Sequence, residues 1–451
     1  MNYIFFILFF FITSFNYLFS QGMDDRSKYY DYGKRFFTDA YIFNTQSPDS
    51  IKIAVYYRFS NSLLSFIKNE SLYNNNEFYS IAVCEVSYRD DKGIIRKREL
   101  NTDTIFVNNF EETKSKTLYK INSIISNLLV SNYDINIELR NINNVKIQQV
   151  RIPRIVTKKS IFDNTISKPI LCYKIDENGH FFPFILDSAI SFSSKNSHIL
   201  IEITDSIESN YKYEIEQIPI SKNNELNWGE FTKLSGVINP DYGKMLNISN
   251  ELRYKSTIIK TENILNGELK QKIGIIDISL PPERIIPGNF RLNLFKVNTK
   301  DTFKFNFKIE WEDMPISLRM PEYAAEMMYY ILTDEEYKHI NSGDNSTILG
   351  NIINFWKKKD PTRFTEYNES MAEYFKRVDY AFFNFQTLSE KDGAKTERGK
   401  IYILYGKPDS TDRTLNDGST FEEWVYEKLK KKFIFESKSN QIFRLVKIID
   451  M

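Results

Sequence analysis

The polar residues best suited to chemistry lie in the last third of the chain. They are Asp360, Glu369, Arg377, Thr396, Arg398, Asp409 and Trp424. Carboxylates beside arginines could supply acid–base groups and charge stabilisation to a glycan- or peptide-acting hydrolase. The same residue types also cap helices, form turns and pair inside proteins. No G-x-S-x-G elbow, P-loop or G-x-G-x-x-G accompanies them, so no motif supports catalysis.

Three of these residues belong to predicted helices. Asp360 precedes Pro361-Thr362 at a helix exit, which favours a cap or turn. Glu369 follows Asn368 in the first turn of the next helix, where negative charge suits the macrodipole. Arg377 lies two turns along, where it either extends to solvent or pairs with Asp360 or Glu369.

Three of the other four flank a predicted strand, Lys400–Tyr405, and Trp424 lies in a later strand-like segment. Thr396 and Arg398 enter this strand, and Asp409 belongs to the turn Gly406–Asp409 that closes it. Trp424 is more typical of a core residue than of a ligand platform. All seven residues remain candidates for binding.

The sequence predicts neither a metal site nor a cofactor. His180, His198 and His339 share no helical spacing, and none adjoins a cysteine. Cys84 and Cys172 each lie in an apolar run, which favours free buried thiols. A disulfide between them is the alternative in an oxidising compartment.

Composition narrows the class of protein. A chain of 451 residues with 42% hydrophobic residues can form several domains with large cores. The net charge of +1 gives no electrostatic footprint for nucleic acid. The basic runs Lys357–Lys359 and Lys430–Lys432 are typical of solvated surface.

The first 22 residues are expected to be a secretory signal peptide. Tyr3–Thr13 is almost entirely apolar, and Ser20–Gly22 supplies small residues near a cleavage site. An uncleaved anchor over Tyr3–Phe19 is the alternative. The signal peptide predicts export to the periplasm, the outer membrane or the exterior. No later stretch is long and apolar enough to span a membrane.

Patterning predicts a multidomain, mainly β protein. We expect a linker over 23–49, antiparallel β-sandwich domains over 50–157 and 158–313, and a small α+β domain over 314–451. A short similarity links the sandwiches: Asn132–Ile137 and Asn289–Leu294 both read N-[aromatic]-x-[Ile/Leu]-N-[Ile/Leu]. We interpret them as equivalent late strands of two domains sharing one plan.

In the α+β domain the apolar period changes to that of helices. Thr333 and Glu336 form a capping box, and the apolar faces Ile348–Trp356 and Met371–Phe385 follow. Segments around Trp424, Phe433 and Leu445 then predict a meander.

This C-terminal part, Met314–Met451, resembles the GWxTD domain family of bacterial proteins. Phe355–Thr362 is similar to the family's F-W-x-x-[KR]-D-P-T block, Thr396–Asp409 to its T-D-R-G-x-[IV]-Y-I-x-Y-G-x-P-D run, and Glu423–Tyr426 to its final motif. The naming pentapeptide departs, with Ala394 for Trp and Glu397 for Asp. The resemblance implies an exported protein with β-sandwich domains ahead of the module, and it implies no activity.

Three hypotheses therefore stand. The first is a non-enzymatic protein that binds a protein or another component of the cell envelope. The second is the hydrolase, which would use Asp360, Glu369, Arg377, Arg398 and Asp409. The third is a carbohydrate-binding module with exposed aromatic side chains. The absence of catalytic motifs favours the first.

Overall fold

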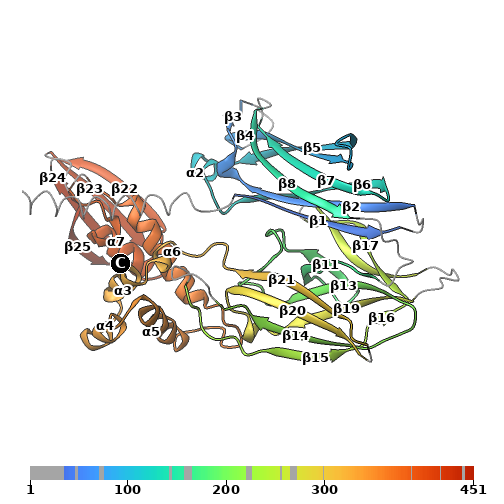
Figure 1. Cartoon of the computed structure of the whole chain (residues 1–451). Helices are drawn as coiled ribbons and strands as arrows, with labels where there is room; N and C mark the ends of the chain where they lie inside the picture. Colours follow the sequence, from blue (N-terminus) through green and yellow to red (C-terminus); the bar gives the residue numbers. More distant parts are fainter. Residues whose placement is uncertain are drawn as a thin grey trace, which may run out of the picture. The chain divides into compact units, whose positions relative to one another are not determined.

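The computed structural model divides into two compact units. One contains residues 33–219 and 230–312, and the other is formed mainly by residues 313–451 (Figure 1). The structure describes residues 35–45, 49–70, 76–141, 145–156, 165–219, 226–253, 256–264, 272–297, 299–387, 389–416, 418–438 and 442–451. The expected signal peptide lies outside these residues.

The first unit begins with a two-sheet sandwich. One sheet consists of β1 (Phe36–Asn44), β2 (Ser50–Ser60) and β6 (Tyr119–Leu129), in that order. The other consists of β3 (Ile67–Lys68), β4 (Phe78–Arg89), β7 (Asn132–Arg140) and β8 (Lys146–Val156), with β5 (Ile95–Val107) beside β4. Short helices η1 (Asn61–Leu63) and α2 (Phe110–Thr113) lie in the connections.

Alternating side chains of both sheets form the core of this sandwich. Val55 and Tyr57 of β2 pack in one cluster with Val86 of β4 and Ile137 of β7, all fully buried. Each such side chain contributes about 1.5–3 kcal/mol through burial. The alternation of apolar residues that predicted these strands therefore matches the alternate side chains that point into the core.

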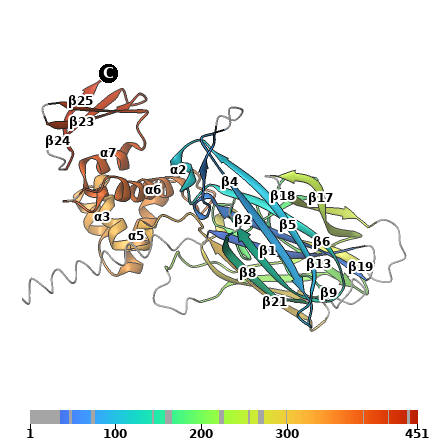
Figure 2. The same cartoon turned by 90° about the horizontal axis from the view of Figure 1, so that it is seen from above.

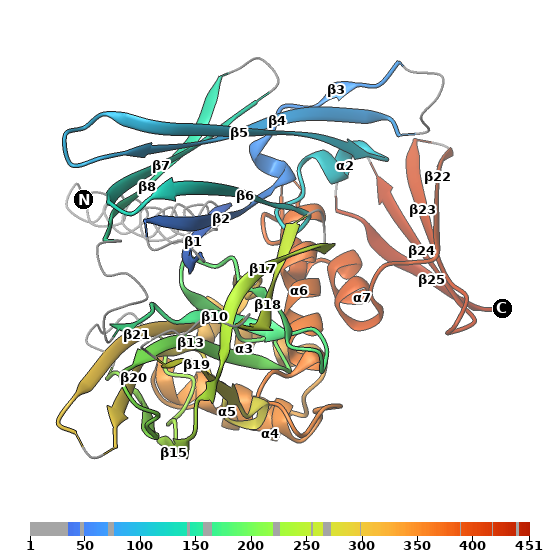
Figure 3. The same ribbon diagram turned by 90° about the vertical axis from the view of Figure 1, so that its right-hand side faces the viewer.

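A second sandwich follows in the same unit. Its larger sheet runs β16 (Asp241–Tyr242), β19 (Lys272–Leu280), β13 (Ser197–Asp205), β10 (Ile170–Lys174), β11 (His180–Pro183), β18 (Ser256–Asn263) and β17 (Lys244–Arg253), with β9 (Thr165–Ile166) on β13. Its other sheet runs β12 (Ala189–Ser191), β21 (Thr302–Glu310), β20 (Gly288–Lys296), β14 (Tyr211–Gln217) and β15 (Leu234–Ile238). A helical turn, η2 (Pro282–Arg284), precedes β20. Figure 3 shows β17 and β18 as a long hairpin.

The two sandwiches share one topology. The sheet β1-β2-β6 corresponds to β10-β13-β19, and the sheet β5-β4-β7-β8 corresponds to β15-β14-β20-β21. The similar sequences Asn132–Ile137 and Asn289–Leu294 occupy β7 and β20, which are equivalent strands. The interpretation of a shared plan is therefore confirmed.

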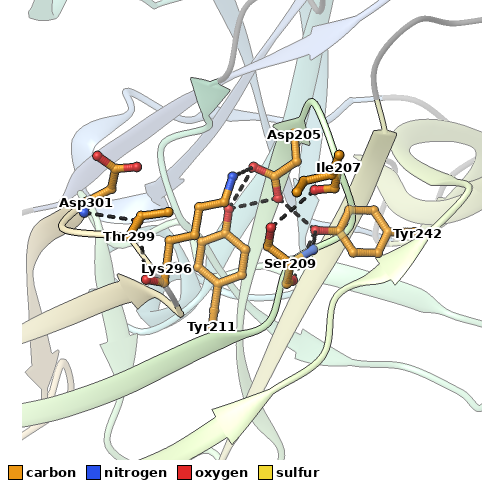
Figure 4. A network of polar contacts seen from close by, with 8 residues as sticks. All are labelled: Asp205, Ile207, Ser209, Tyr211, Tyr242, Lys296, Thr299 and Asp301. Carbon is orange, nitrogen blue, oxygen red and sulfur yellow. Dashed lines mark hydrogen bonds and ion pairs between the residues drawn. The ribbon is translucent and has the colours of Figure 1, made fainter.

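Buried aspartates connect the two sheets within each sandwich. At the end of β13, Asp205 accepts hydrogen bonds from Tyr211 of β14 at 3.0 Å and Tyr242 of β16 at 2.7 Å (Figure 4). Lys296 of β20 pairs with the same carboxylate at 2.6 Å. In the first sandwich Asp103 of β5 accepts from Tyr57 of β2 and is 3.3 Å from the Lys120 amine. Each carboxylate thus fixes one sheet against the other.

A third aspartate connects the two sandwiches. Asp39 of β1 accepts from the backbone N–H groups of Leu186 at 3.0 Å and Ser188 at 2.8 Å. Asp187 and Ser188 have φ of 56° and 63°, a left-handed backbone that costs energy in non-glycine residues. Burial raises the pKa of Asp39 to about 6, against the opposing effect of Lys168. The carboxylate therefore stabilises a strained turn from a distant strand.

The other unit has the predicted α+β arrangement, with helices first and then a sheet. Its helices are η3 (Ser317–Arg319), α3 (Pro321–Met327), η4 (Met328–Tyr330), α4 (Asp334–Ile340), α5 (Asn345–Lys357), α6 (Glu369–Asn384), η5 (Gly393–Lys395) and α7 (Glu397–Tyr405). Its sheet has the order β22 (Ser410–Asn416), β23 (Ser419–Tyr426), β24 (Lys431–Lys438) and β25 (Arg444–Asp450). Helix α7 lies against this sheet (Figure 2).

The prediction of a strand over Lys400–Tyr405 is wrong, because this segment belongs to helix α7. Thr396 caps the helix by accepting from the N–H of Gly399 at 3.0 Å, and Gly406 ends it at φ +80°. The run of Ile and Tyr residues reflects burial between α6 and the sheet. A short apolar run does not distinguish a buried helix from a strand.

The structure also bears on the predicted capping box, the cysteines, the expected linker and the membrane span. The capping box of Thr333 and Glu336 is present, and both cysteines are free and buried. Strand β1 lies inside residues 23–49, which we expected to be a linker. No helix among the described residues is long and apolar enough to cross a membrane.

The position of Asp39 predicts a pH-dependent contribution to stability. Its folded pKa of about 6 exceeds the ordinary 3.8, so its stabilising contribution is complete below pH 3.8 and is lost as the pH rises through 6. Between pH 7 and pH 4.5, wild type should gain on the order of 2 kcal/mol in unfolding free energy relative to Asp39→Asn. Urea unfolding of both proteins across this range measures the difference, and parallel curves would contradict it.

Candidate functional site

Helices α5, α6 and α7 enclose an open cavity of about 370 Å³. Its apolar wall includes Trp356 of α5, Tyr374 of α6 and Ile403 of α7, and the Trp356 and Tyr374 ring centroids lie 5.2 Å apart. Glu369, Glu373 and Arg377 supply its charged groups. They recur every four residues along α6, so they share one face of the helix.

Glu369 and Asp360 are connected through one threonine. Asp360 accepts from the N–H of Thr362 at 2.8 Å, which is the predicted turn at the helix exit. The hydroxyl of Thr362 in turn donates to Glu369. Asp360 therefore orders the segment that leads into α6, while Glu369 lines the cavity.

Arg377 lies two turns after Glu369 along α6 and also lines the cavity. Its Nε donates to Glu373 at 2.7 Å, and Gly406 packs against the guanidinium so closely that a Cβ there would lie 3.1 Å from Arg377 Cζ. Among the described residues, Arg377 donates to Glu373 and to the carbonyl oxygen of Leu404, rather than to the expected Asp360 or Glu369. With two carboxylates and one guanidinium, the charged groups of the cavity sum to −1.

The pentapeptide Gly393–Glu397 is a structural joint. A Cβ on Gly393 would overlap the carbonyl oxygen of Ala381 in α6, so only glycine permits this approach. Ala394 is fully buried, and its carbonyl accepts from Tyr330 at 2.9 Å. Thr396 caps α7, and Glu397 accepts from the N–H of Leu445 in β25. The segment joins α6, α7 and the sheet.

Arg398 and Trp424 meet at a carboxylate that sequence analysis missed. Glu422 of β23 accepts from Arg398 at 3.1 Å, from Arg413 at 2.6 Å and from Trp424 Nε1 at 2.7 Å. Burial opposes ionisation of Glu422, but these hydrogen bonds and charges outweigh it and lower its pKa. Arg398 also stacks over Phe443 at 4.1 Å.

Asp409 and Trp424 have roles that the sequence indicated. Asp409 is exposed in the turn after α7 and accepts from the N–H of Glu427 at 2.8 Å. Trp424 is only 2% exposed and belongs to the core between α7 and the sheet. Neither residue lines the cavity.

The seven candidates thus separate into different environments. Glu369 and Arg377 share the cavity, Arg398 and Trp424 share Glu422, and Asp360, Thr396 and Asp409 stabilise local backbone. Among the described residues, no three His, Cys, Asp or Glu side chains form a group suited to a metal ion. The cavity of α5, α6 and α7 presents an apolar wall beside two carboxylates and one guanidinium.

Substitution of Glu422 should destabilise the C-terminal unit. Glu422→Gln leaves the buried Arg398 without its counter-charge, and breaking such a pair costs about 3–5 kcal/mol. The control Glu423→Gln breaks the more exposed pair with Lys432, which is worth below about 1 kcal/mol. Urea unfolding followed by tryptophan fluorescence tests this, and equal midpoints for the two variants would contradict it.

Comparison with known proteins identifies a family for the C-terminal part of the chain. Residues 292–447 match the family model of the GWxTD domain, about a third of the chain. No curated protein matches the chain. The match contains every candidate residue, the pentapeptide Gly393–Glu397 and most of the sheet. The chain therefore carries a GWxTD domain in its C-terminal region.

Proposed function

We propose that this protein is exported to the cell envelope and acts there by binding a partner in the cavity of α5, α6 and α7. The observation that carries the proposal is the composition of this cavity. Its walls are apolar, and its lining carries two carboxylates and one guanidinium, a formal charge of −1. A basic side chain presented by a partner protein, with its aliphatic stem along Trp356 and Tyr374, would satisfy both features.

Binding is favoured over hydrolysis by the distribution of the polar residues. Only Glu369 and Arg377, of the five proposed for a hydrolase, line the cavity. Glu373 is already paired with Arg377, and Arg398 is bound to Glu422. A hydrolase needs an acid and a base around one substrate atom. The separation of these side chains supports a non-enzymatic role.

Export is supported by the first 22 residues and by the resemblance to the GWxTD family. The apolar run Tyr3–Thr13 and the small residues Ser20–Gly22 have the order of a signal peptide. A chain recovered from the envelope should therefore begin near Gly22 or Met23. Mass spectrometry of the N-terminal peptide measures this, and a cytoplasmic chain that retains Tyr3–Thr13 would refute it.

Filling the cavity should abolish partner binding. Ser370 lines it in the first turn of α6, so Ser370→Trp places an indole in the space that a partner would occupy. In cells that make the protein natively, a photo-crosslinker introduced at the uncharged lining residue Ile331 should capture a basic partner. Ser370→Trp should reduce this product about tenfold or more through steric exclusion.

The matched control is Ser346→Trp, because Ser346 is exposed in the first turn of α5 and does not line the cavity. It should leave the crosslinked product unchanged. Thermal unfolding of each variant verifies that it is folded. A folded Ser370→Trp protein that still captures the same partner at wild-type yield would rule out this cavity as the site.

A further inference from the structure

A second cavity, of about 290 Å³, lies in the unit that contains the sandwiches. The first sandwich contributes Arg58 of β2 and Ile121 of β6. The second contributes Tyr173 of β10 and, from the segment Phe182–Ser194, the residues Phe182–Leu186, Ser191, Ser193 and Ser194. Glu312 follows β21 and completes the lining. This segment lies between β10 and β13, where the equivalent strands β1 and β2 of the first sandwich follow one another directly.

Contacts within the protein hold the charged groups of this cavity in place. Arg58 pairs with Glu312, and its guanidinium lies 4.4 Å from the Phe37 ring centroid and 4.6 Å from that of Tyr119. The Arg58 side chain is only 11% exposed, and its buried Nε has no hydrogen-bond partner among the described residues. The pair is neutral overall, so the cavity selects neither an anion nor a cation by charge.

The remaining walls combine hydroxyl and aromatic groups. Ser191, Ser193 and Ser194 line the cavity, and the Ser191 and Ser193 hydroxyls lie 3.1 Å apart. Serine hydroxyls both donate and accept hydrogen bonds. The Tyr173 ring lies 5.6 Å from Phe182 and 5.7 Å from Phe184, which makes one wall aromatic.

The turn between the lining residues Leu186 and Ser191 is held by hydrogen bonds. Asp187 and Ser188 adopt the left-handed backbone, and Asp39 of β1 accepts from the N–H groups of Leu186 and Ser188. Strain of this kind persists only where the surroundings enforce it, and it concentrates at binding sites. A wall fixed before binding loses less entropy when a ligand arrives.

We infer that this cavity binds one sugar residue of a neutral glycan. A sugar ring offers hydroxyls that donate and accept, which matches the serines and the Arg58–Glu312 pair. Its C–H faces match the aromatic wall. The volume lies at the small end of ligand sites, roughly 300–1,000 Å³, and so suits one ring. The site is separate from the cavity of α5, α6 and α7, so the two proposals fail independently.

The test uses the full mature chain on an array of neutral and acidic glycans, followed by calorimetric titration with the best neutral oligosaccharide. Ser193 is exposed and lines the cavity, so Ser193→Trp should lower the affinity about tenfold or more by occupying it. Ser235→Trp, on exposed β15 of the same sandwich, should leave it within about twofold.

Charge gives a second readout. Binding of a neutral sugar should change less than about twofold between 50 and 500 mM NaCl, because no ion pair forms. Glu312→Gln leaves Arg58 unopposed, so the affinity for a uronic acid relative to its neutral parent sugar should rise about tenfold. Absence of neutral-glycan binding, or binding that Ser193→Trp leaves unchanged, would overturn the inference.

Discussion

Buried carboxylates hold the sheets and helices of this structure together. An ionised acid inside a protein needs hydrogen-bond donors to replace water, and here the donors lie on neighbouring elements. Asp205 finds them on the opposite sheet of its sandwich, and Asp39 finds them on the neighbouring sandwich. Glu422 finds them on α7 and on its own sheet. Apolar packing alone would allow each pair of elements to slide. Directional hydrogen bonds to a single carboxylate fix one arrangement.

In the GWxTD domain the corresponding constraint is a close approach of backbones. Gly393 rests on α6, and a Cβ on Gly399 would in turn overlap the carbonyl oxygen of Gly393. Glycine at both positions therefore lets η5 pack closely between α6 and α7. Helix α6 carries Glu369 and Arg377 and helix α7 carries Ile403, so this packing positions two of the helices that line the cavity. The motif acts on the site by positioning it.

Periodicity predicted most elements of this fold, since alternation and helical spacing follow burial directly. It failed at α7, where the burial of Ile401 and Ile403 on both sides removed the polar face that marks a helix. The candidate site was predicted in part. Glu369 and Arg377 share one helix, so their spacing brings them together. Glu422 was missed because it lies 24 residues from Arg398 along the chain, a separation that neither helical nor strand periodicity connects.

Comparison of the two sandwiches separates the features that serve their shared fold from those found in one sandwich. Residues that both copies share serve the fold, as β7 and β20 do at the centre of equivalent sheets. The segment between β10 and β13 exists only in the second copy, and it supplies the serines, aromatic rings and strained turn of one cavity. The shared topology of the two sandwiches does not require the strained turn at Asp187 and Ser188, so other contacts must maintain it. Because Asp39 of the first copy stabilises that turn, the cavity is a property of the pair of sandwiches.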